Sequence, residues 1–224
     1  MVEVNGRCNL GCAFCELKDR PELDAERLSA LLDQLRQDHE AGAHRLRIGG
    51  GEPCLEPRLA ELVAGARDMG YETILLETNG TVASLAEVAP GLATAGVTDV
   101  LWAIPSADPE VTDLVTGLPG SHTAALAGVK ALSAAGVRVI ARTPLTAPVL
   151  PGLSAMPTWL QAEVPGLVGW WLRPLKRSPR SAFDSGLIPP LAELGSAIID
   201  AARVARQVGL SLEVDDEVGL PLCL

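Results

Sequence analysis

Short apolar segments alternate with helical segments along almost the whole chain. Runs typical of strands lie at residues 1–4, 46–48, 73–76, 97–104, 137–141 and 167–172, with a weaker one at 210–214. The intervening segments carry apolar residues at helical spacing, at residues 28–35, 59–66, 84–92, 123–135, 157–164 and 191–208. Strands that alternate with helices form parallel sheets with right-handed crossovers. The pattern therefore predicts an α/β fold, and about six such units suit a partial (β/α)6 TIM-like barrel better than a closed eightfold one.

Capping residues support several of the predicted helices. Asp24 is a candidate N-cap for the first helix, and Gly70, Gly136 and Gly209 follow helical segments as typical C-terminal stops. The stretch at residues 144–157 is rich in proline, which predicts a loop.

The length and charge of the chain limit the classes of protein to which it can belong. Its 224 residues suit a single domain, which we expect over residues 1–224. The net charge of -10 disfavours a nucleic-acid partner. No apolar run is long enough to span a bilayer, and residues 1–7 lack the pattern of a signal peptide. We therefore expect a cytoplasmic protein without a nucleic-acid or membrane partner.

Polar or glycine-rich motifs follow the predicted strands. In α/β folds the functional loops follow the C-terminal ends of the strands, so such motifs gather at one rim. In chain order the motifs are residues 8–15, 49–53 and 78–80, the pair Ser106 and Asp108, then Arg142 and residues 173–176. We therefore place the functional site at this rim.

Three of the five cysteines lie in one segment, CNLGCAFC at residues 8–15. In its CxxxCxxC spacing, three thiolates can hold three irons of a cubane cluster, which leaves the fourth iron open to an outside ligand. Gly11 permits the tight turn between the ligands. An odd number of cysteines without an export signal argues against a disulfide framework. The segment therefore predicts a metal site on Cys8, Cys12 and Cys15.

A structural zinc site is the alternative for this segment. His39 and His44 have a spacing that zinc-binding histidines use, but they lie further from Cys15 than the roughly 12–15 residues usual in a zinc finger. In the predicted topology they also flank the start of the second strand, at the rim opposite the cysteines. No second cysteine pair follows Cys15 in the sequence. These points favour an iron–sulfur cluster over zinc.

The segment CNLGCAFC resembles the signature loop of the radical S-adenosylmethionine (radical SAM) superfamily, and GGGEP at residues 49–53 resembles the GGE motif of that family. The resemblance implies a [4Fe–4S] cluster on the three cysteines, with S-adenosylmethionine chelated to the open iron. It implies an oxidoreductase-type reaction in which one electron, from a donor of the flavodoxin or ferredoxin type, cleaves S-adenosylmethionine. The resulting 5′-deoxyadenosyl radical takes a hydrogen atom from the substrate, so the cofactor carries the difficult chemistry.

The resemblance also implies which residues hold S-adenosylmethionine. Gly50 and Gly51 allow a close approach of the backbone to the methionyl end. Glu52 accepts a charge-assisted hydrogen bond from the ammonium group of that end, and Phe14 packs near the adenine. The alternatives are a plain glycine turn with an exposed glutamate, and ordinary core packing for Phe14.

The later loops are expected to add further cofactor contacts. Ser106 can bind a ribose hydroxyl or the cofactor carboxylate, and Asp108 is a second candidate that can instead cap the helix after it. Arg142 can pair with the cofactor carboxylate or form an ordinary ion pair at the rim. Leu175 matches a family position whose backbone meets the adenine.

Arg47, Thr78 and Asn79 are the expected substrate-binding residues, because the resemblance places these positions toward the substrate in some relatives. A basic run can attract an anionic group of the substrate, or can simply be a solvated loop; it comprises Arg173, Lys176, Arg177 and Arg180. Cys54 is expected to be a small buried residue. Cys223 stands alone near the end of the sequence, so no auxiliary cluster is expected.

The resemblance favours an enzyme that modifies a peptide or a small metabolite, in the branch with peptide-maturation and molybdenum-cofactor biosynthesis enzymes. Two alternatives remain open, an activase of a glycyl-radical enzyme and a non-catalytic module that binds the cluster and cofactor. A non-catalytic module is typically marked by a broken cysteine segment or a missing glutamate in GGEP, and both are intact here.

Overall fold

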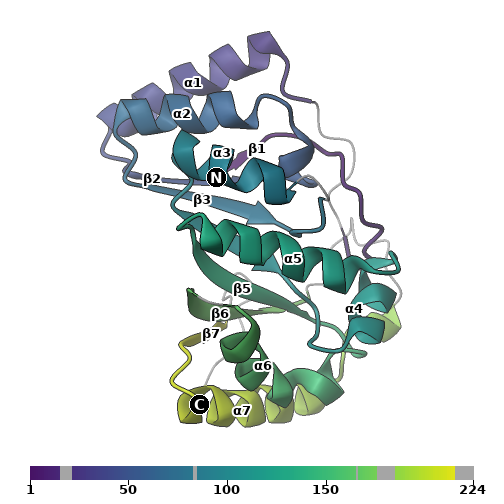
Figure 1. The fold of residues 1–224 in the computed structure, drawn as a ribbon. Helices are drawn as coiled ribbons and strands as arrows, with labels where there is room; N and C mark the ends of the chain where they lie inside the picture. Colours follow the sequence, from purple (N-terminus) through teal and green to yellow (C-terminus); the bar gives the residue numbers. More distant parts are fainter. Residues whose placement is uncertain (16–21, 83–84, 165, 176–184, 215–224) are drawn as a thin grey trace. The chain divides into compact units, whose positions relative to one another are not determined.

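The fold is seen in a computed structural model. In the described part of the chain, seven strands pair side by side in the order in which they follow one another in the sequence (Figure 1). The structure describes residues 1–15, 22–82, 85–164, 166–175 and 185–214. The strands are β1 (Val2–Glu3), β2 (Arg45–Gly49), β3 (Thr73–Thr78), β4 (Asp99–Ala103), β5 (Arg138–Leu145), β6 (Leu167–Pro174) and β7 (Leu212–Val214). The pairs β1–β2, β2–β3, β3–β4 and β6–β7 are parallel. The predicted α/β class with a parallel, unclosed sheet is therefore confirmed.

Helices follow most of the strands, as the alternating sequence pattern predicts. They are α1 (Ala25–Glu40), α2 (Leu59–Met69), α3 (Leu85–Ala95), α4 (Pro109–Thr116), α5 (Ser121–Ala134), α6 (Met156–Glu163) and α7 (Leu191–Gln207), with the short 3-10 helices η1 (Pro53–Leu55), η2 (Leu150–Ala155) and η3 (Ser185–Leu187). Asp24 caps α1 by accepting from Arg27 N at 2.8 Å, and Gly70 ends α2 with a φ of 104°. No helix in the described ranges is long and apolar enough to cross a membrane.

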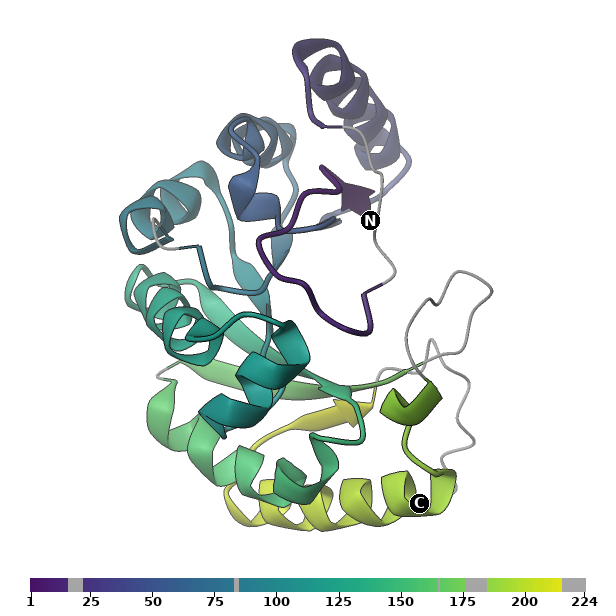
Figure 2. The same cartoon turned by 90° about the vertical axis from the view of Figure 1, so that its right-hand side faces the viewer.

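The first compact unit comprises residues 1–9, 17–102 and 123–139. It contains β1, β2, β3 and most of β4, and α1, α2 and α3 lie in a row against these strands (Figure 1, Figure 2). β3 alternates half-buried and buried residues, as a strand with a period of two should. Helix faces and strands contribute to its core, which includes Leu28, Leu35, Ile48, Leu62, Val63, Ala66, Ile74 and Leu76.

The second compact unit comprises residues 10–16, 103–122 and 140–224. Within it, η2, α6 and α7 pack on one another, α6 packs on β6, and β6 pairs with β7. Trp170 of β6 is fully buried, and its Nε1 donates to Thr143 Oγ1 at 2.9 Å, so the one polar atom of the indole has a partner.

β5 runs further than the sequence predicts. It continues past residue 141 to residue 145, so Arg142 lies inside the strand and the prediction that it follows the strand is wrong. Pro144 cannot donate a backbone hydrogen bond, but its neighbours hold the extension in place. Ile104 N donates to Arg142 O at 2.9 Å, and Thr143 Oγ1 donates to Ile104 O at 2.8 Å.

β6 is also longer than predicted and ends at residue 174, so Arg173 belongs to the strand and not to the loop after it. The side chain of Arg173 is exposed, because it stands on the outward half of the strand alternation, between the buried Leu172 and Pro174. The stretch at 144–157 was predicted as a loop, but it contains the end of β5, η2 and the start of α6.

The chain that leads from β1 to Cys8 lies directly on the loop after β2. Three backbone hydrogen bonds extend the parallel pairing beyond the strand ends: Val4 N to Gly49 O at 2.9 Å, Gly51 N to Asn5 O at 2.9 Å, and Glu52 N to Arg7 O at 2.7 Å. A Cβ atom on Gly51 would overlap the carbonyl oxygen of Arg7, and one on Gly50 would lie 2.6 Å from Asn5 O. Glycine is therefore required at both positions by the neighbouring backbone.

We predict that Gly51→Ala lowers the free energy of unfolding by about 1–3 kcal/mol, the cost typical of overpacking. The collision is with the backbone of Arg7, which cannot retreat without losing its hydrogen bond from Glu52 N. Gly195→Ala in α7 is the matched control, because a Cβ there meets nothing within 4 Å; it should stabilise the protein by about 0.5–1 kcal/mol. Urea unfolding measures both changes, and a Gly51→Ala protein as stable as the parent would contradict this packing.

Candidate functional site

Glu52 is a fully buried carboxylate that binds the end of β3. Its Oε1 accepts from Cys54 N at 2.9 Å and from Thr78 Oγ1 at 2.8 Å, and its Oε2 accepts from Asn79 N at 2.7 Å. The side chain is 0% exposed. The glutamate is therefore not an exposed loop residue, and it fixes the loop after β2 to the loop after β3.

Burial shifts the ionisation of the two titratable groups in this loop. Burial raises the pKa of Glu52, and the hydrogen bonds from Asn79, Cys54 and Thr78 offset part of the rise. Burial and, second, the charge of Glu52 raise the pKa of the Cys54 thiol well above its ordinary value. Cys54 is therefore a neutral thiol and a weak nucleophile at neutral pH, and it donates to Thr78 Oγ1 at 3.6 Å.

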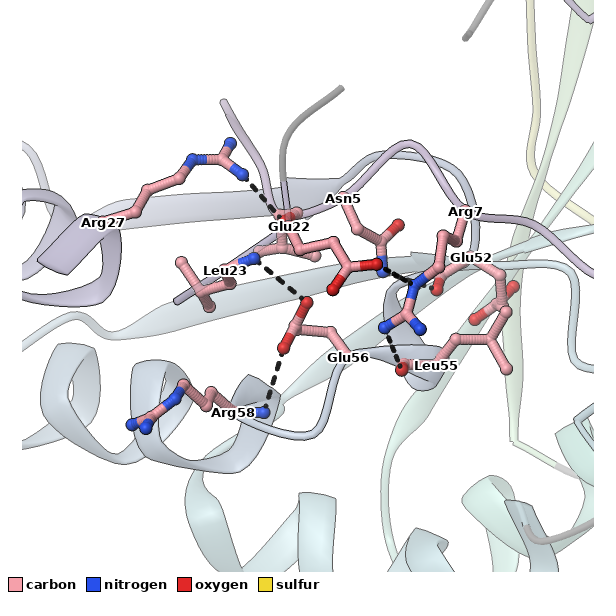
Figure 3. A network of polar contacts seen from close by, with 10 residues as sticks. Asn5, Arg7, Glu22, Leu23, Arg27, Glu52, Leu55, Glu56 and Arg58 are labelled. Atoms are coloured by element: carbon pink, nitrogen blue, oxygen red, sulfur yellow. Dashed lines mark hydrogen bonds and ion pairs between the residues drawn. The ribbon is translucent and has the colours of Figure 1, made fainter. Parts of the chain in front are cut away.

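Side chains add a second set of contacts between the first two loops (Figure 3). Asn5 Nδ2 donates to Glu52 O at 3.2 Å, and the guanidinium of Arg7 donates to Leu55 O at 3.4 Å. The buried carboxylate of Glu56 accepts from the backbone N–H groups of Leu23 and Arg58, each at 3.3 Å. The segment before Cys8 is thus held by both backbone and side-chain hydrogen bonds.

Asn79 is held in a ring of hydrogen bonds with two other side chains. Asn9 Nδ2 donates to Thr81 Oγ1 at 2.7 Å, Thr81 Oγ1 donates to Asn79 Oδ1 at 2.7 Å, and Asn79 Nδ2 donates to Asn9 Oδ1 at 3.1 Å. Asn79 Nδ2 also lies 3.7 Å from Cys8 Sγ, as a donor to the sulfur. Asn9 and Thr81 were not predicted as site residues, although they directly follow Cys8 and the motif at residues 78–80.

In the second unit, the cysteine segment rests on the C-terminal end of α4. Gly11 N donates to Thr116 O at 3.0 Å and Ala13 N to Val115 O at 3.3 Å, so two carbonyls of the last helical turn are satisfied by this segment. Gly117, with a φ of 70°, ends the helix, and a Cβ on it would lie 3.0 Å from Gly11 O. The position of the segment therefore depends on α4.

The N-terminal end of α4 carries two of the predicted cofactor contacts. The carboxylate of Asp108 caps the helix by accepting from Glu110 N at 2.9 Å, which is the alternative role that the sequence left open. Ser106 is buried, and its Oγ accepts from Asp108 N at 3.1 Å. Thr112 Oγ1 accepts from Ser106 N and donates to Ser106 O, which fixes this loop to the helix.

The other predicted residues have varied surroundings. Arg47 forms an ion pair with Glu77 of β3, and both side chains are partly buried. Phe14, Arg142 and Leu175 are half-buried. Lys176, Arg177, Arg180 and Cys223 lie outside the described residues.

The ligand chemistry of the cysteines fits an iron–sulfur cluster, since thiolates are its usual ligands. Cys8 and Cys15 are exposed, Cys12 is half-buried, and none of the four described cysteines forms a disulfide. Within the residues that the structure describes, no three His, Cys, Asp or Glu side chains are gathered into a preformed metal site. Ligation by the three cysteines therefore remains a prediction.

Two known enzymes match part of this chain. The PqqA peptide cyclase of Streptomyces rochei is 34% identical over 142 residues, which are 61% of this chain and 37% of that protein. GTP 3′,8-cyclase 1 of Mycobacterium tuberculosis is 30% identical over 147 residues, which are 60% of this chain and 39% of that protein. The chain thus spans less than half the length of these relatives.

Solved structures share the fold of this chain. Streptococcus suis SuiB bound to the precursor peptide SuiA superposes with a TM-score of 0.77 at 15% identity, over 96% of this chain and 48% of that one. The sequence profile of the radical SAM superfamily matches residues 2–157. Because these residues are well over half of the 224 in the sequence, the chain belongs to the radical SAM superfamily.

Proposed function

We propose that this chain catalyses radical chemistry with S-adenosylmethionine, using a [4Fe–4S] cluster on Cys8, Cys12 and Cys15. One observation carries the proposal. Residues 5–7, which lead into the CNLGCAFC segment, are joined to GGGEP by two backbone hydrogen bonds, from Gly51 N at 2.9 Å and from Glu52 N at 2.7 Å. When bound, the cluster supplies the electron that cleaves S-adenosylmethionine, and the chain itself binds and orients the reacting groups.

Glu52 is proposed to bind the ammonium group of the cofactor as well as the end of β3. Its Oε2 accepts from Asn79 N, and a carboxylate oxygen can accept a second hydrogen bond. A carboxylate in a buried setting forms a strong, charge-assisted bond with an ammonium group. The further proposed contacts of the cofactor are Gly50, Gly51, Phe14, Ser106, Asp108, Arg142 and Leu175.

The proposed substrate is a peptide or a small metabolite, with Arg47 and Thr78 as candidate contacts. The names of the relatives support this choice, since one is a peptide cyclase and another a GTP cyclase. A structure with the same fold holds a precursor peptide. The proposed electron source is a flavodoxin or ferredoxin type of protein in the cytoplasm.

Reconstitution of the cluster tests the proposal directly. Anaerobic treatment with iron and sulfide should load about four irons per chain, the content of one cubane, and dithionite with S-adenosylmethionine should then release 5′-deoxyadenosine. Cys12→Ala should lose both properties because it removes a ligand, whereas Cys54→Ala, the matched change outside the segment, should keep both. A parent protein that takes up only zinc would refute the proposal. A filled cluster without 5′-deoxyadenosine would point to the non-catalytic module.

We predict that Glu52→Gln weakens binding of S-adenosylmethionine about tenfold to a hundredfold while the iron content is kept. A hydrogen bond to a charged group is worth about 1.5–3 kcal/mol, which corresponds to that range of affinity. Glu56→Gln is the matched control, because both carboxylates are buried and accept from two backbone N–H groups.

Equilibrium binding titration of the iron-loaded variants gives the comparison. Glu56→Gln should bind the cofactor with the affinity of the parent, even if it lowers the free energy of unfolding as much as Glu52→Gln does. Equal affinities for all three proteins would mean that Glu52 has only its structural role, and loss of iron in Glu52→Gln would mean that it supports the cluster segment instead.

The support of the cysteine segment by α4 can be tested with two glycine substitutions. Gly117 and Gly120 both have left-handed backbones, with φ of 70° and 80°, but only a Cβ on Gly117 meets the cysteine segment, 3.0 Å from Gly11 O. Both alanine variants therefore bear the same backbone strain, and only Gly117→Ala also displaces Gly11. Iron content after reconstitution should fall for Gly117→Ala and stay at the parent level for Gly120→Ala; equal loading would show that this contact does not position the ligands.

A further inference from the structure

The orientation of the Asn79 amide is set by a backbone group. Asn79 Oδ1 accepts from Thr81 N at 2.8 Å, and a backbone N–H can only donate, so the oxygen must face Thr81. The amide nitrogen therefore faces Asn9 and Cys8. The ring with Asn9 and Thr81 is consistent with this orientation, since each of its three hydrogen bonds then joins a donor to an acceptor.

The side-chain amide of Asn79 forms four hydrogen bonds, which use its full capacity. Oδ1 accepts two, from Thr81 N and Thr81 Oγ1, and Nδ2 donates two, to Asn9 Oδ1 and Cys8 Sγ. The residue is only 8% exposed. This arrangement favours a role toward Cys8 over the substrate contact that the sequence predicted for Asn79.

We infer that Asn79 is a positioning residue for the cluster, and that its amide hydrogen bond to Cys8 Sγ raises the cluster's reduction potential. The inference rests on the proposed function, because it takes Cys8 as a cluster ligand. An amide N–H directed at a ligand sulfur stabilises negative charge on that sulfur, and the reduced cluster carries one more negative charge than the oxidised one. Hydrogen bonds to sulfur are among the factors that set the potentials of iron–sulfur clusters.

Burial and rigidity make this hydrogen bond effective. Water competes little with a donor on a mostly buried side chain, and electrostatic interactions are stronger in such a setting than in water. The backbone N–H of Thr81 orients the amide before any ligand binds, so the donor does not have to reorient when an electron arrives. The loop after β3 thus acts on the loop after β1 through one side chain.

The test is the midpoint potential of the reconstituted protein without S-adenosylmethionine, measured by redox titration followed by electron paramagnetic resonance. Asn79→Ala removes the donor, and Asn79→Asp removes it with little change of shape and adds a negative charge. Thr81→Val is the matched control, because it removes the hydroxyl of the ring but keeps the backbone N–H that orients Asn79.

Both Asn79 variants should have a more negative potential than the parent, with the larger shift in Asn79→Asp. For Asn79→Ala we expect a threefold to tenfold change in the one-electron equilibrium constant, or about 28–59 mV at 59 mV per tenfold. Thr81→Val should keep the parent value.

Three outcomes would overturn the inference. The first is a fully loaded Asn79→Ala protein with the midpoint potential of the parent. The second is a shift of the potential in Thr81→Val as large as that in Asn79→Ala, which would mean that the shift comes from loosening of the loop. Failure of both Asn79 variants to hold a cluster that Thr81→Val retains would mean a purely structural role. If the parent itself yields no cluster signal, the proposed function fails, and that failure is separate from the first three.

Discussion

The first unit depends on one buried carboxylate, that of Glu52. It accepts from two backbone N–H groups and one hydroxyl, which come from its own loop and from the end of β3. A buried charge is costly unless such donors surround it, and removal of a partner leaves the full desolvation cost. Because the same loop is bonded to Asn5 and Arg7, the carboxylate also supports the segment that leads to Cys8. The side chain of Glu52 thus combines a structural role with a proposed role in binding the cofactor.

α4 supports two loops within the second unit. Its eight residues span about 12 Å at 1.5 Å per residue, with the loop of Ser106 and Asp108 at one end and the segment of Cys12 and Cys15 at the other. A short helix transmits position well, because its backbone hydrogen bonds leave little freedom between its ends. The loop proposed to contact the cofactor and the segment proposed to bind iron therefore share one rigid support.

The sequence predicted the fold well where the signal is local. Apolar periodicity located the strands and most of the helices, although it did not predict α4, and the caps at Asp24 and Gly70 lie where expected. The sequence placed the ends of β5 and β6 too early. In β5, the extension past Arg142 depends on pairing with the distant Ile104. The sequence also did not predict that the backbone of Asn5 and Arg7 lies directly against Gly50 and Gly51. Contacts between loops that lie some 45 residues apart leave no periodic pattern in the sequence, so periodicity does not predict them.

Radical chemistry by this chain requires a cluster on the cysteine segment with one iron open to S-adenosylmethionine. Electron paramagnetic resonance of the reconstituted, dithionite-reduced protein, recorded before and after addition of S-adenosylmethionine, tests this most directly. We expect the signal of a reduced [4Fe–4S] cluster, and a change in that signal on addition, because the cofactor would bind the open iron. A cluster signal that S-adenosylmethionine leaves unchanged, or a protein that holds zinc and gives no signal, would contradict it.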